Sequence, residues 1–273
     1  MAIDKAVDSI ALDSALTDIA NAIRTKTGGT DPLTLEQMPG EIEGIQSGDP
    51  FAGLEMAQTF TYSGGAPDEK FIANFARAVN LDNAFTASSP RELIDITVTS
   101  ALTSMRQLAK GVRYPKKIII RGDMSNVTNL YRAFNQTGNN GGFLTELLGL
   151  DFTSVTDAGL WLDNQNDLTT LEIKADTVNI ALRISDCGNL TVESCINILN
   201  ALKDRTGQNA LTLTCHANLN TPDTGRLYVN YVKLDADTGL YVSCEQTDEG
   251  AMTIADAIIA KNWTIAGGDE NES

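Results

Sequence analysis

The chain is short of the residues from which most catalytic, metal and nucleic-acid sites are built. Its 273 residues include one histidine and four cysteines, and no two cysteines have the C-x-x-C spacing of a zinc or redox motif. Lys and Arg number 20 against 36 Asp and Glu, which gives a net charge of −16. Phosphate binding needs clustered Lys and Arg, so this balance argues against a nucleic-acid partner. We predict no metal and no cofactor, and we interpret the acidity as favouring solubility.

Long apolar runs are also missing. No stretch of about 18 apolar residues is present, which predicts no membrane span. Residues 1–10, MAIDKAVDSI, contain acids and lack the apolar centre of a secretion signal, so we expect synthesis in a reducing cytosol. The cysteines are therefore predicted to be free thiols, most of them buried at strand or helix positions. They are Cys187, Cys195, Cys215 and Cys244.

Aromatic residues make up 6% of a chain that is 42% hydrophobic, so aliphatic side chains must fill the core. The stretch 179–220 shows how. Alternating apolar residues predict a strand at 180–184, Thr191 opens a helix that ends before Gly207, and a second strand begins at Leu211. Such a unit has an apolar face that it cannot bury alone, which predicts stacking on neighbours of the same kind.

Related strand segments recur along the chain, with helical or irregular returns such as 125–134 between them. The predicted strands are 93–99, 116–122, 147–153, 168–174, 181–186 and 210–216. The core positions that we assign to them are Ile96, Ile119, Leu150, Ile173, Ile184 and Leu213. Four of the five steps between these positions fall close to the 20–29 residues of a leucine-rich repeat. The step from Ile173 to Ile184 is much shorter, which means either that two segments are limbs of one coil or that one strand is misplaced.

The flanking segments differ from the repeats. Residues 1–46 carry apolar residues at helical spacing, which predicts short helices that pack on a partner. A strand is predicted at 57–62, and Phe71, Phe75, Val79 and Leu81 predict a helix or a capping element that begins the array. At the other end the pattern predicts a β-hairpin over 225–246, which turns at 235–239, and then a last helix and a closing strand within 252–267.

The predicted fold is therefore α/β: a leucine-rich-repeat solenoid with a small α-helical N-terminal module and a C-terminal β-hairpin. We predict a helical attachment and oligomerisation module at 1–48, a repeat domain with cap and hairpin at 49–267, and a disordered acidic tail at 268–273. The apolar residues of the module are expected to attach it and to form a homo-oligomer, a trimer in the first instance. They are Leu12, Leu16, Ile19, Ile23, Leu33, Met38, Ile42 and Ile45.

Two segments resemble parts of known families. The segment 189–220, NLTVESCINILNALKDRTGQNALTLTCHANLN, resembles the leucine-rich repeats of the bacterial surface-antigen type found in phage tail and other virion proteins. The segment 13–45, DSALTDIANAIRTKTGGTDPLTLEQMPGEIEGI, is similar to an N-terminal module common in phage structural proteins of gut bacteria. Together they cover about a third of the chain. The resemblance implies a virion protein, made in the bacterial host cytoplasm, that attaches to other virion proteins through its first module.

Residues that would suggest an enzyme have simpler interpretations. His216 has no second histidine or cysteine at ligand spacing and is predicted to lie at the surface or at a strand end. The segment 235–239, DADTG, is similar to the start of a calcium loop, but Gln246 stands where the twelfth ligand would be Glu, so a hairpin turn is favoured. The density of acids at Asp151, Asp157, Asp163 and Asp167 is explained by repeat turns rich in Asp and Asn. We predict no enzymatic activity.

The expected function is thus structural: a phage particle surface protein of the tail, baseplate or fibre. One alternative is binding of a host receptor or glycan, with Tyr228, Tyr231 and Tyr241 on the hairpin as contacts. The opposing interpretation is that these tyrosines pack on the solenoid. A fibre that decorates the head is the other alternative.

Overall fold

The computed structural model describes Thr17, Ala20 and Asn21 and residues 70–85, 92–111, 115–135 and 143–267. The chain divides into two compact units, Met1–Leu54 and Glu55–Ser273. In the first unit the three described residues are helical. The predicted strand at 57–62, the acidic tail and the predicted attachment residues lie outside the described residues, and the predicted domain limits stay predictions. Those attachment residues are Leu12, Leu16, Ile19, Ile23, Leu33, Met38, Ile42 and Ile45.

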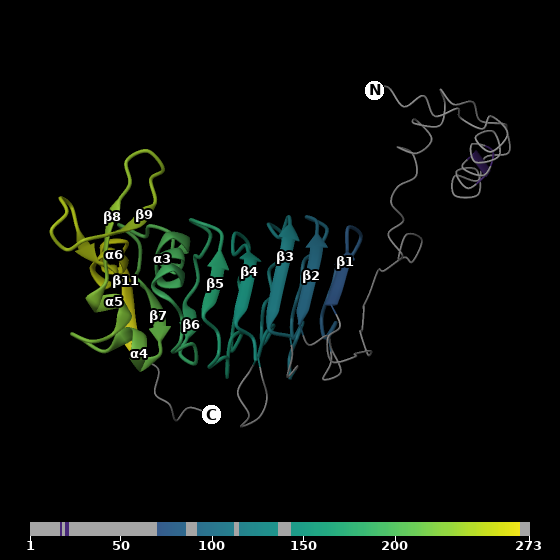
Figure 1. Cartoon of the computed structure of the whole chain (residues 1–273), viewed down its shortest axis with the longest axis horizontal. Coiled ribbons are helices and arrows are strands. Elements are labelled where there is room, and N and C mark those ends of the chain that lie inside the picture. The colour runs from purple at the N-terminus through teal and green to yellow at the C-terminus, as the bar shows by residue number, and fades with distance from the viewer. Residues whose placement is uncertain are drawn as a thin grey trace, which may run out of the picture. The chain divides into compact units, whose positions relative to one another are not determined.

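A parallel sheet of five strands, in the order of the sequence, forms much of the second unit (Figure 1). Its strands are β1 (Lys70–Asn74), β2 (Leu93–Val98), β3 (Lys117–Gly122), β4 (Glu146–Leu150) and β5 (Thr170–Ile173). One row of the register joins Lys70, Leu93, Lys117, Glu146 and Thr170. Neighbours in this row are separated in sequence by 23 to 29 residues. The fold is mixed α/β with a parallel five-stranded sheet, as the coarser part of the prediction requires.

Side chains alternate between the core and the outer face of this sheet, as a strand period of two demands. On β3 the buried residues are Ile118 and Ile120, whereas Ile119 is only half-buried. Ile96 of β2 pairs in register with Ile120. The assignment of Ile119 to the core ladder was therefore wrong by one residue, because three consecutive isoleucines give the sequence no alternation to read.

The returns between strands are stacked turns. One residue of each turn has a left-handed backbone, with φ between 52° and 57°; these residues are Asn83, Gln107, Arg132 and Leu160. Their spacing along the chain follows that of the strands. Backbone N–H groups also bond from turn to turn, for example from Leu81 to the Ser104 carbonyl at 3.0 Å. The return at 125–134 is of this irregular kind and contains no helix.

Asp and Asn recur in these turns for a conformational reason, as predicted. The side-chain oxygens of Asn80, Asn129 and Asp157 each accept a hydrogen bond from the backbone N–H two residues on, at 2.6, 2.9 and 3.0 Å. This is an Asx turn, which these side chains stabilise better than other types. The three residues also form parallel bridges in register, together with Ser104.

The first strand rules out one of the two alternatives predicted for the start of the array, which were a helix and a capping element. Residues 70–74 form β1 and not a helix. The apolar spacing of Phe71, Phe75 and Val79 fits one face of a helix. Phe71 and Phe75 are at positions i and i+4, and such positions also share one face of an extended chain. Phe71 lies 5.2 Å from Phe85 and 6.2 Å from Phe75, ring centre to ring centre. Val79 is exposed.

The predicted unit at 179–220 is present. It consists of β6 (Leu182–Ile184), α3 (Val192–Ala201) and β7 (Leu211–Cys215), and Thr191 caps the helix by accepting a hydrogen bond from the Ser194 N–H at 3.2 Å. β6 belongs to a second parallel sheet, ordered β11-β7-β6, and not to the sheet of β5. The short step from Ile173 to Ile184 is therefore explained by two limbs in different sheets.

Helix α3 closes the five-stranded sheet where a sixth strand would otherwise pair with β5. The backbone N–H of Leu171 donates to Ser194 Oγ at 3.1 Å, and that of Ile173 donates to Asn197 Oδ1 at 2.7 Å. The two acceptors are separated by about one helical turn, so one face of the helix presents both to the strand. This polar edge of α3 satisfies donors that an open strand edge would leave unpaired.

The C-terminal elements follow β7. They are α4 (Ala217–Asn220), α5 (Arg226–Val229), β8 (Tyr231–Leu234), β9 (Tyr241–Cys244), β10 (Met252–Thr253), α6 (Ile254–Ala260) and β11 (Trp263–Gly267). Antiparallel β8 and β9 confirm the predicted hairpin, although 226–229 is helical. The predicted last helix and closing strand are α6 and β11, and β11 pairs with β7.

The glycines at the carboxyl ends of β3 and β4 provide a test of the stacked backbone. Gly149 has φ +83°, and a Cβ built on it would overlap the Ile120 carbonyl oxygen. Gly207 has a similar φ of +80° with nothing near its Cβ position. We expect Gly149→Ala to reduce the free energy of unfolding by about 2 kcal/mol or more, and Gly207→Ala by only about 1 kcal/mol from the left-handed backbone. Urea denaturation of both variants measures the difference, and equal losses would contradict the overlap.

Candidate functional site

The three tyrosines proposed as receptor contacts do not all lie on the hairpin. Tyr231 and Tyr241 are on β8 and β9, but Tyr228 lies in α5 and donates a hydrogen bond from its hydroxyl to Asn220 at 3.2 Å. Tyr228 and Tyr241 are partly buried and pack against the hydrophobic core. Placing Tyr228 on the hairpin was therefore wrong, and the packing interpretation holds for two of the three.

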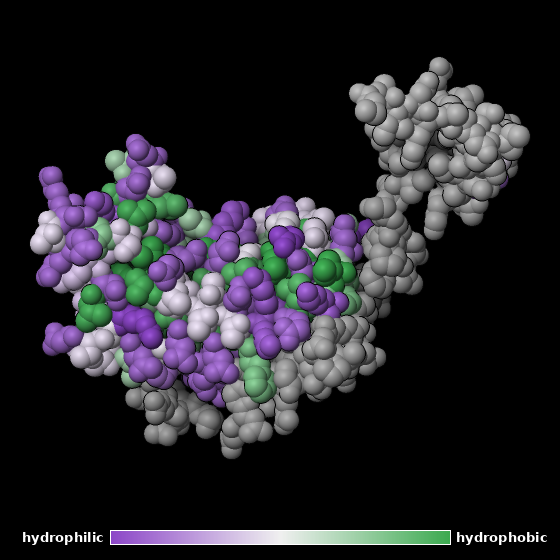
Figure 2. All heavy atoms as spheres, viewed as in Figure 1, coloured by the Kyte–Doolittle hydropathy of each residue, from purple (hydrophilic) through white to green (hydrophobic). Residues whose placement is uncertain are grey.

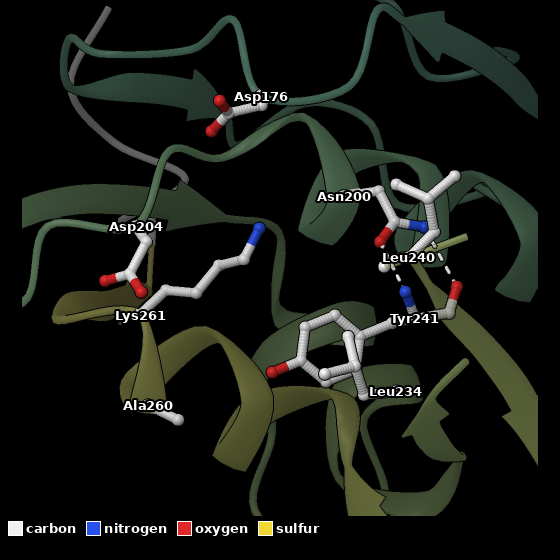
Figure 3. Close-up of a pocket in the computed structure, with 9 residues that line it drawn as sticks. Asp176, Asn200, Asp204, Leu234, Leu240, Tyr241, Ala260 and Lys261 are labelled. Carbon is white, nitrogen blue, oxygen red and sulfur yellow. Dashed lines mark hydrogen bonds between the residues drawn. The ribbon is translucent and has the colours of Figure 1, made fainter. Parts of the chain in front are cut away.

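A pocket of about 440 Å³ lies where the hairpin, the end of α3 and the end of α6 come together (Figure 3). We call it the hairpin pocket. Its lining residues come from segments far apart in the sequence, and they are Asp176, Asn200, Asp204, Leu234, Gly239, Leu240, Tyr241, Ala260 and Lys261. Of these, the sequence analysis singled out Tyr241 alone as a contact.

Asn200 fixes one wall of the hairpin pocket. Its side-chain amide donates to the Tyr241 carbonyl at 2.9 Å, and its side-chain oxygen accepts from the Tyr241 N–H at 2.7 Å (Figure 3). The pair of bonds imitates a strand partner, so the hairpin is docked on the last turn of α3. The end of the hairpin next to its turn therefore packs on α3.

Lys261 forms the floor of the pocket. Its ammonium donates to the carbonyls of Leu199 and Leu202 at 2.9 and 2.6 Å, where the last turn of α3 leaves carbonyls without helical partners. Burial lowers the pKa of Lys261, and the charges of Asp176 and Asp204 offset part of that effect. The ammonium also lies 5.9 Å from the centre of the Tyr241 ring.

Residues next to Lys261 complete this attachment of the C-terminus. The Asn262 amide donates to the carbonyls of Arg205 and Gln208 at 3.1 and 2.7 Å, and the Trp263 indole N–H donates to the Lys203 carbonyl at 2.8 Å. The loop after α3 is therefore held by side chains of three consecutive residues. The walls of the hairpin pocket are fixed by hydrogen bonds before any ligand arrives.

A second hollow, of about 680 Å³, lies at the carboxyl ends of β3, β4 and β5, where Gly122 and Gly149 carry no side chain. Asp151 lies in it and accepts from Lys174 at 2.7 Å and from the Thr153 N–H at 2.8 Å. Burial raises the pKa of Asp151, but the hydrogen bonds from Lys174 and Thr153 outweigh it, so the pKa lies below its usual range. Asp151 is thus an ion-paired acid and a poor proton donor.

The other candidate acids have separate surroundings. Asp157 caps a turn, Asp167 is exposed, and Asp163 lies 3.9 Å from the Arg183 guanidinium. Burial raises the pKa of Asp163, and the positive charge of Arg183 counters it. His216 lies at the end of β7, as predicted, where its Nδ1 accepts a hydrogen bond from the Asn218 N–H at 3.0 Å and caps α4.

All four cysteines are free, and Cys187, Cys195 and Cys215 are buried as predicted. Burial raises the pKa of the Cys195 thiol to about 12, so this thiol is protonated and inert at neutral pH. Among the described residues, no group of three or more His, Cys, Asp or Glu side chains could hold a metal ion. The turn at 235–239 is a hairpin turn, in which Asp235 accepts from the N–H groups of Asp237 and Thr238, each at 2.9 Å.

Comparison of the chain with protein-family models, curated proteins and solved structures gives no match. In the part of the chain that the structure describes, every helix is too short or too polar to cross a bilayer.

The bonds of Lys261 to α3 predict a loss of stability on substitution. Lys261→Met keeps the apolar stem but leaves two carbonyls without their donor, so we expect the free energy of unfolding to fall by about 1–3 kcal/mol. Lys203→Met is the control, because within the described residues the Lys203 side chain makes no hydrogen bond or ion pair; we expect a change within about 0.5 kcal/mol. Urea unfolding measures both, and equal effects would show that the Lys261 bonds contribute nothing.

The lowered pKa of Asp151 predicts a dependence on pH. Because this pKa is lower in the folded than in the unfolded chain, its stabilisation is present above the ordinary aspartate pKa and is lost as pH falls through the lowered value. We expect Asp151→Asn to cost about 1–2 kcal/mol at pH 7, after allowance for the exposed Lys174, and much less at pH 3. Unfolding measured at both pH values is the test. A cost that does not depend on pH would mean that the carboxylate charge is not involved.

Proposed function

We propose that this chain is a non-enzymatic structural protein of a bacteriophage particle, displayed on the tail, baseplate or fibre and anchored to other virion proteins through residues 1–48. The observation that carries the proposal is the resemblance of 189–220 to repeats found in virion proteins. It gains support from the geometry of that segment, because β6, α3 and β7 follow one another as such a repeat requires. The similarity of 13–45 to a phage structural module supports the anchor.

The finer fold that we propose for the second unit is a leucine-rich-repeat solenoid. The sequence separation between parallel neighbours in the register agrees with the length of such repeats. One buried aliphatic row runs through the strands from Ile94 to Ile118, Leu147 and Leu171. The Asx turns at Asn80, Asn129 and Asp157 repeat on the opposite limb. Turn and strand thus share one period, which favours stacked coils over a single globular core.

A stacked array suits display more than catalysis. Each segment contacts its neighbours through backbone hydrogen bonds, so a broad face is held rigid without any active-site loop. Charged pairs lie on the outer face of the sheet, such as Arg121 with Asp95 at 2.8 Å and Lys117 with Glu146 at 2.5 Å. These pairs keep the face soluble while the core stays apolar.

Binding of a host receptor or glycan is the second candidate function. The hairpin pocket favours it, because this concave site has fixed walls and brings Tyr241 together with Asp176 and Lys261. A displayed protein that carries such a pocket has a place for a ligand, whereas a purely passive decoration needs none. The two functions are compatible, because the protein must be displayed on the particle surface before it can bind a host receptor or glycan.

Location on the particle tests the main proposal. Antibodies raised against residues 70–267 should label intact particles at the tail, baseplate or fibre. Labelling at the head would favour the decorating fibre instead. Absence of the chain from purified particles, checked by mass spectrometry, would contradict the proposed structural role.

The anchor predicts a change in mass when it is removed. We expect the full chain to be a homo-oligomer, a trimer in our first assignment, and a fragment that begins at Asp49 to be a monomer, because the apolar residues of 1–48 are expected to form the contacts. Light-scattering mass of the two proteins at equal concentration decides this. Two monomers, or two oligomers of the same order, would contradict the assignment of the interface to this module.

A further inference from the structure

The hairpin pocket has two chemically different sides. In Figure 3, Asp176 and Asp204 lie to one side of the Lys261 side chain, and Tyr241 and Leu234 lie to the other. Leu234 is 58% exposed and Leu240 is 38% exposed, and Figure 2 shows hydrophobic side chains at the surface around the hairpin. Leu234 pairs with Tyr241 across the two strands. An apolar wall and a carboxylate wall therefore meet in one pocket.

Some carboxylate oxygens of the hairpin pocket accept no hydrogen bond from the described residues. Asp204 accepts from the N–H and hydroxyl of Thr206 at 2.8 and 2.7 Å through Oδ1, while no hydrogen bond from a described residue is found for its Oδ2. Within the described residues, no hydrogen bond or ion pair is found for the Asp176 carboxylate either. Lys261, the cation among the lining residues, directs its ammonium to the end of α3. Two carboxylates against one ammonium leave the lining residues with a formal charge of −1.

These features fit one kind of ligand group. A long basic side chain has an apolar stem that packs on leucine and tyrosine and a charged head that carboxylates accept. Arginine fits better than lysine, because its guanidinium is planar, donates from a fixed fork and stacks on aromatic rings. A neutral saccharide would use the tyrosine ring but would gain nothing from an excess of negative charge.

We propose that the hairpin pocket binds an arginine side chain that projects from a partner protein. The inference deepens the proposed function, on which it rests for the identity of that partner as a virion or host-surface protein. The first unit of this chain is a poor candidate for the partner, because residues 1–54 contain three basic residues, Lys5, Arg24 and Lys26, among a larger number of acids.

The pocket can be tested directly with a small probe. The probe is the acetylated and amidated tripeptide Leu-Arg-Leu, and the comparison is the same peptide with citrulline, which keeps the shape of arginine without its charge. Methyl NMR of Leu234 and Leu240 in the full-length protein reports binding. We expect saturable shifts with the arginine peptide, and a Kd at least about fivefold weaker with citrulline, as the loss of a charge-assisted hydrogen bond at a partly exposed site implies.

The matched variants are Asp176→Asn with Asp204→Asn, against Asp237→Asn. Asparagine keeps the side-chain oxygen that Thr206 needs, and it tolerates the left-handed backbone of Asp176, whose φ is +56°. We expect the double variant to weaken arginine-peptide binding at least about fivefold, since both carboxylate charges are lost. Asp237 is in the hairpin turn and does not line the pocket, so Asp237→Asn should leave the Kd within about twofold.

The outcomes separate the alternatives. Equal binding of the arginine and citrulline peptides, or equal binding by the double variant, overturns the proposal. So does a lack of methyl shifts with either peptide. Binding of glucose or N-acetylglucosamine at the same methyls, unchanged in the double variant, would overturn it in favour of a saccharide site. Particle labelling is independent of all these results, so a failed pocket and a failed virion assignment are distinguishable.

Discussion

Backbone hydrogen bonding between successive segments of chain is the constraint on which the second unit depends. A parallel strand satisfies one side of its backbone with the previous segment and offers the other side to the next. Between β1 and β5 this exchange proceeds in constant order, and the turns on the opposite limb repeat it, as the bond from Leu81 to Ser104 illustrates. At β5 the pattern changes, because Ser194 and Asn197 of α3 take the donors of the strand. The later elements β9, α5 and α6 contact that helix.

The hairpin pocket follows from the same helix. A helix that replaces a strand brings its own unpaired carbonyls at its last turn, and Lys261 returns from the C-terminus to bind those of Leu199 and Leu202. Asn200, on the same turn, holds the hairpin through the Tyr241 backbone. Because α3 both closes the sheet and holds the hairpin, a concave space is left between the helix and the hairpin, and its acids lie beside the half-buried side chain of Lys261. The candidate site is a consequence of how the end of the sheet is closed.

Sequence reasoning correctly predicted elements that local residue patterns determine. It failed where the structure depends on strand register or on contacts between residues far apart in the sequence. Thr191 and the apolar residues after it are sufficient to predict α3, and the alternation on both sides of 235–239 is sufficient to predict the hairpin. Ile119 was misplaced because consecutive isoleucines hide the strand phase. A helix was one of two alternatives for the segment that begins at Phe71, because the spacing of Phe71 and Phe75 suits both periods. The pocket could not be predicted, since Asp176, Asn200 and Lys261 meet only through tertiary packing. A weak signal existed in the polar residues Ser194, Asn197 and Asn200, spaced by three along a helix whose other residues, apart from Glu193, are apolar.

The substitution of α3 side chains for a sixth strand affects how such a protein can change in size. Within the sheet, the strand whose N–H groups bond to α3 side chains is β5, so duplication of an internal segment between β1 and β5 would insert one more strand and turn while leaving β5, α3 and the hairpin unaltered. Each inserted segment would move the first strand away from the hairpin by about 4.8 Å, the spacing of paired strands. Reach and recognition can therefore evolve separately: the number of segments sets how far the hairpin stands from the start of the array, and the residues after β5 set what it contacts.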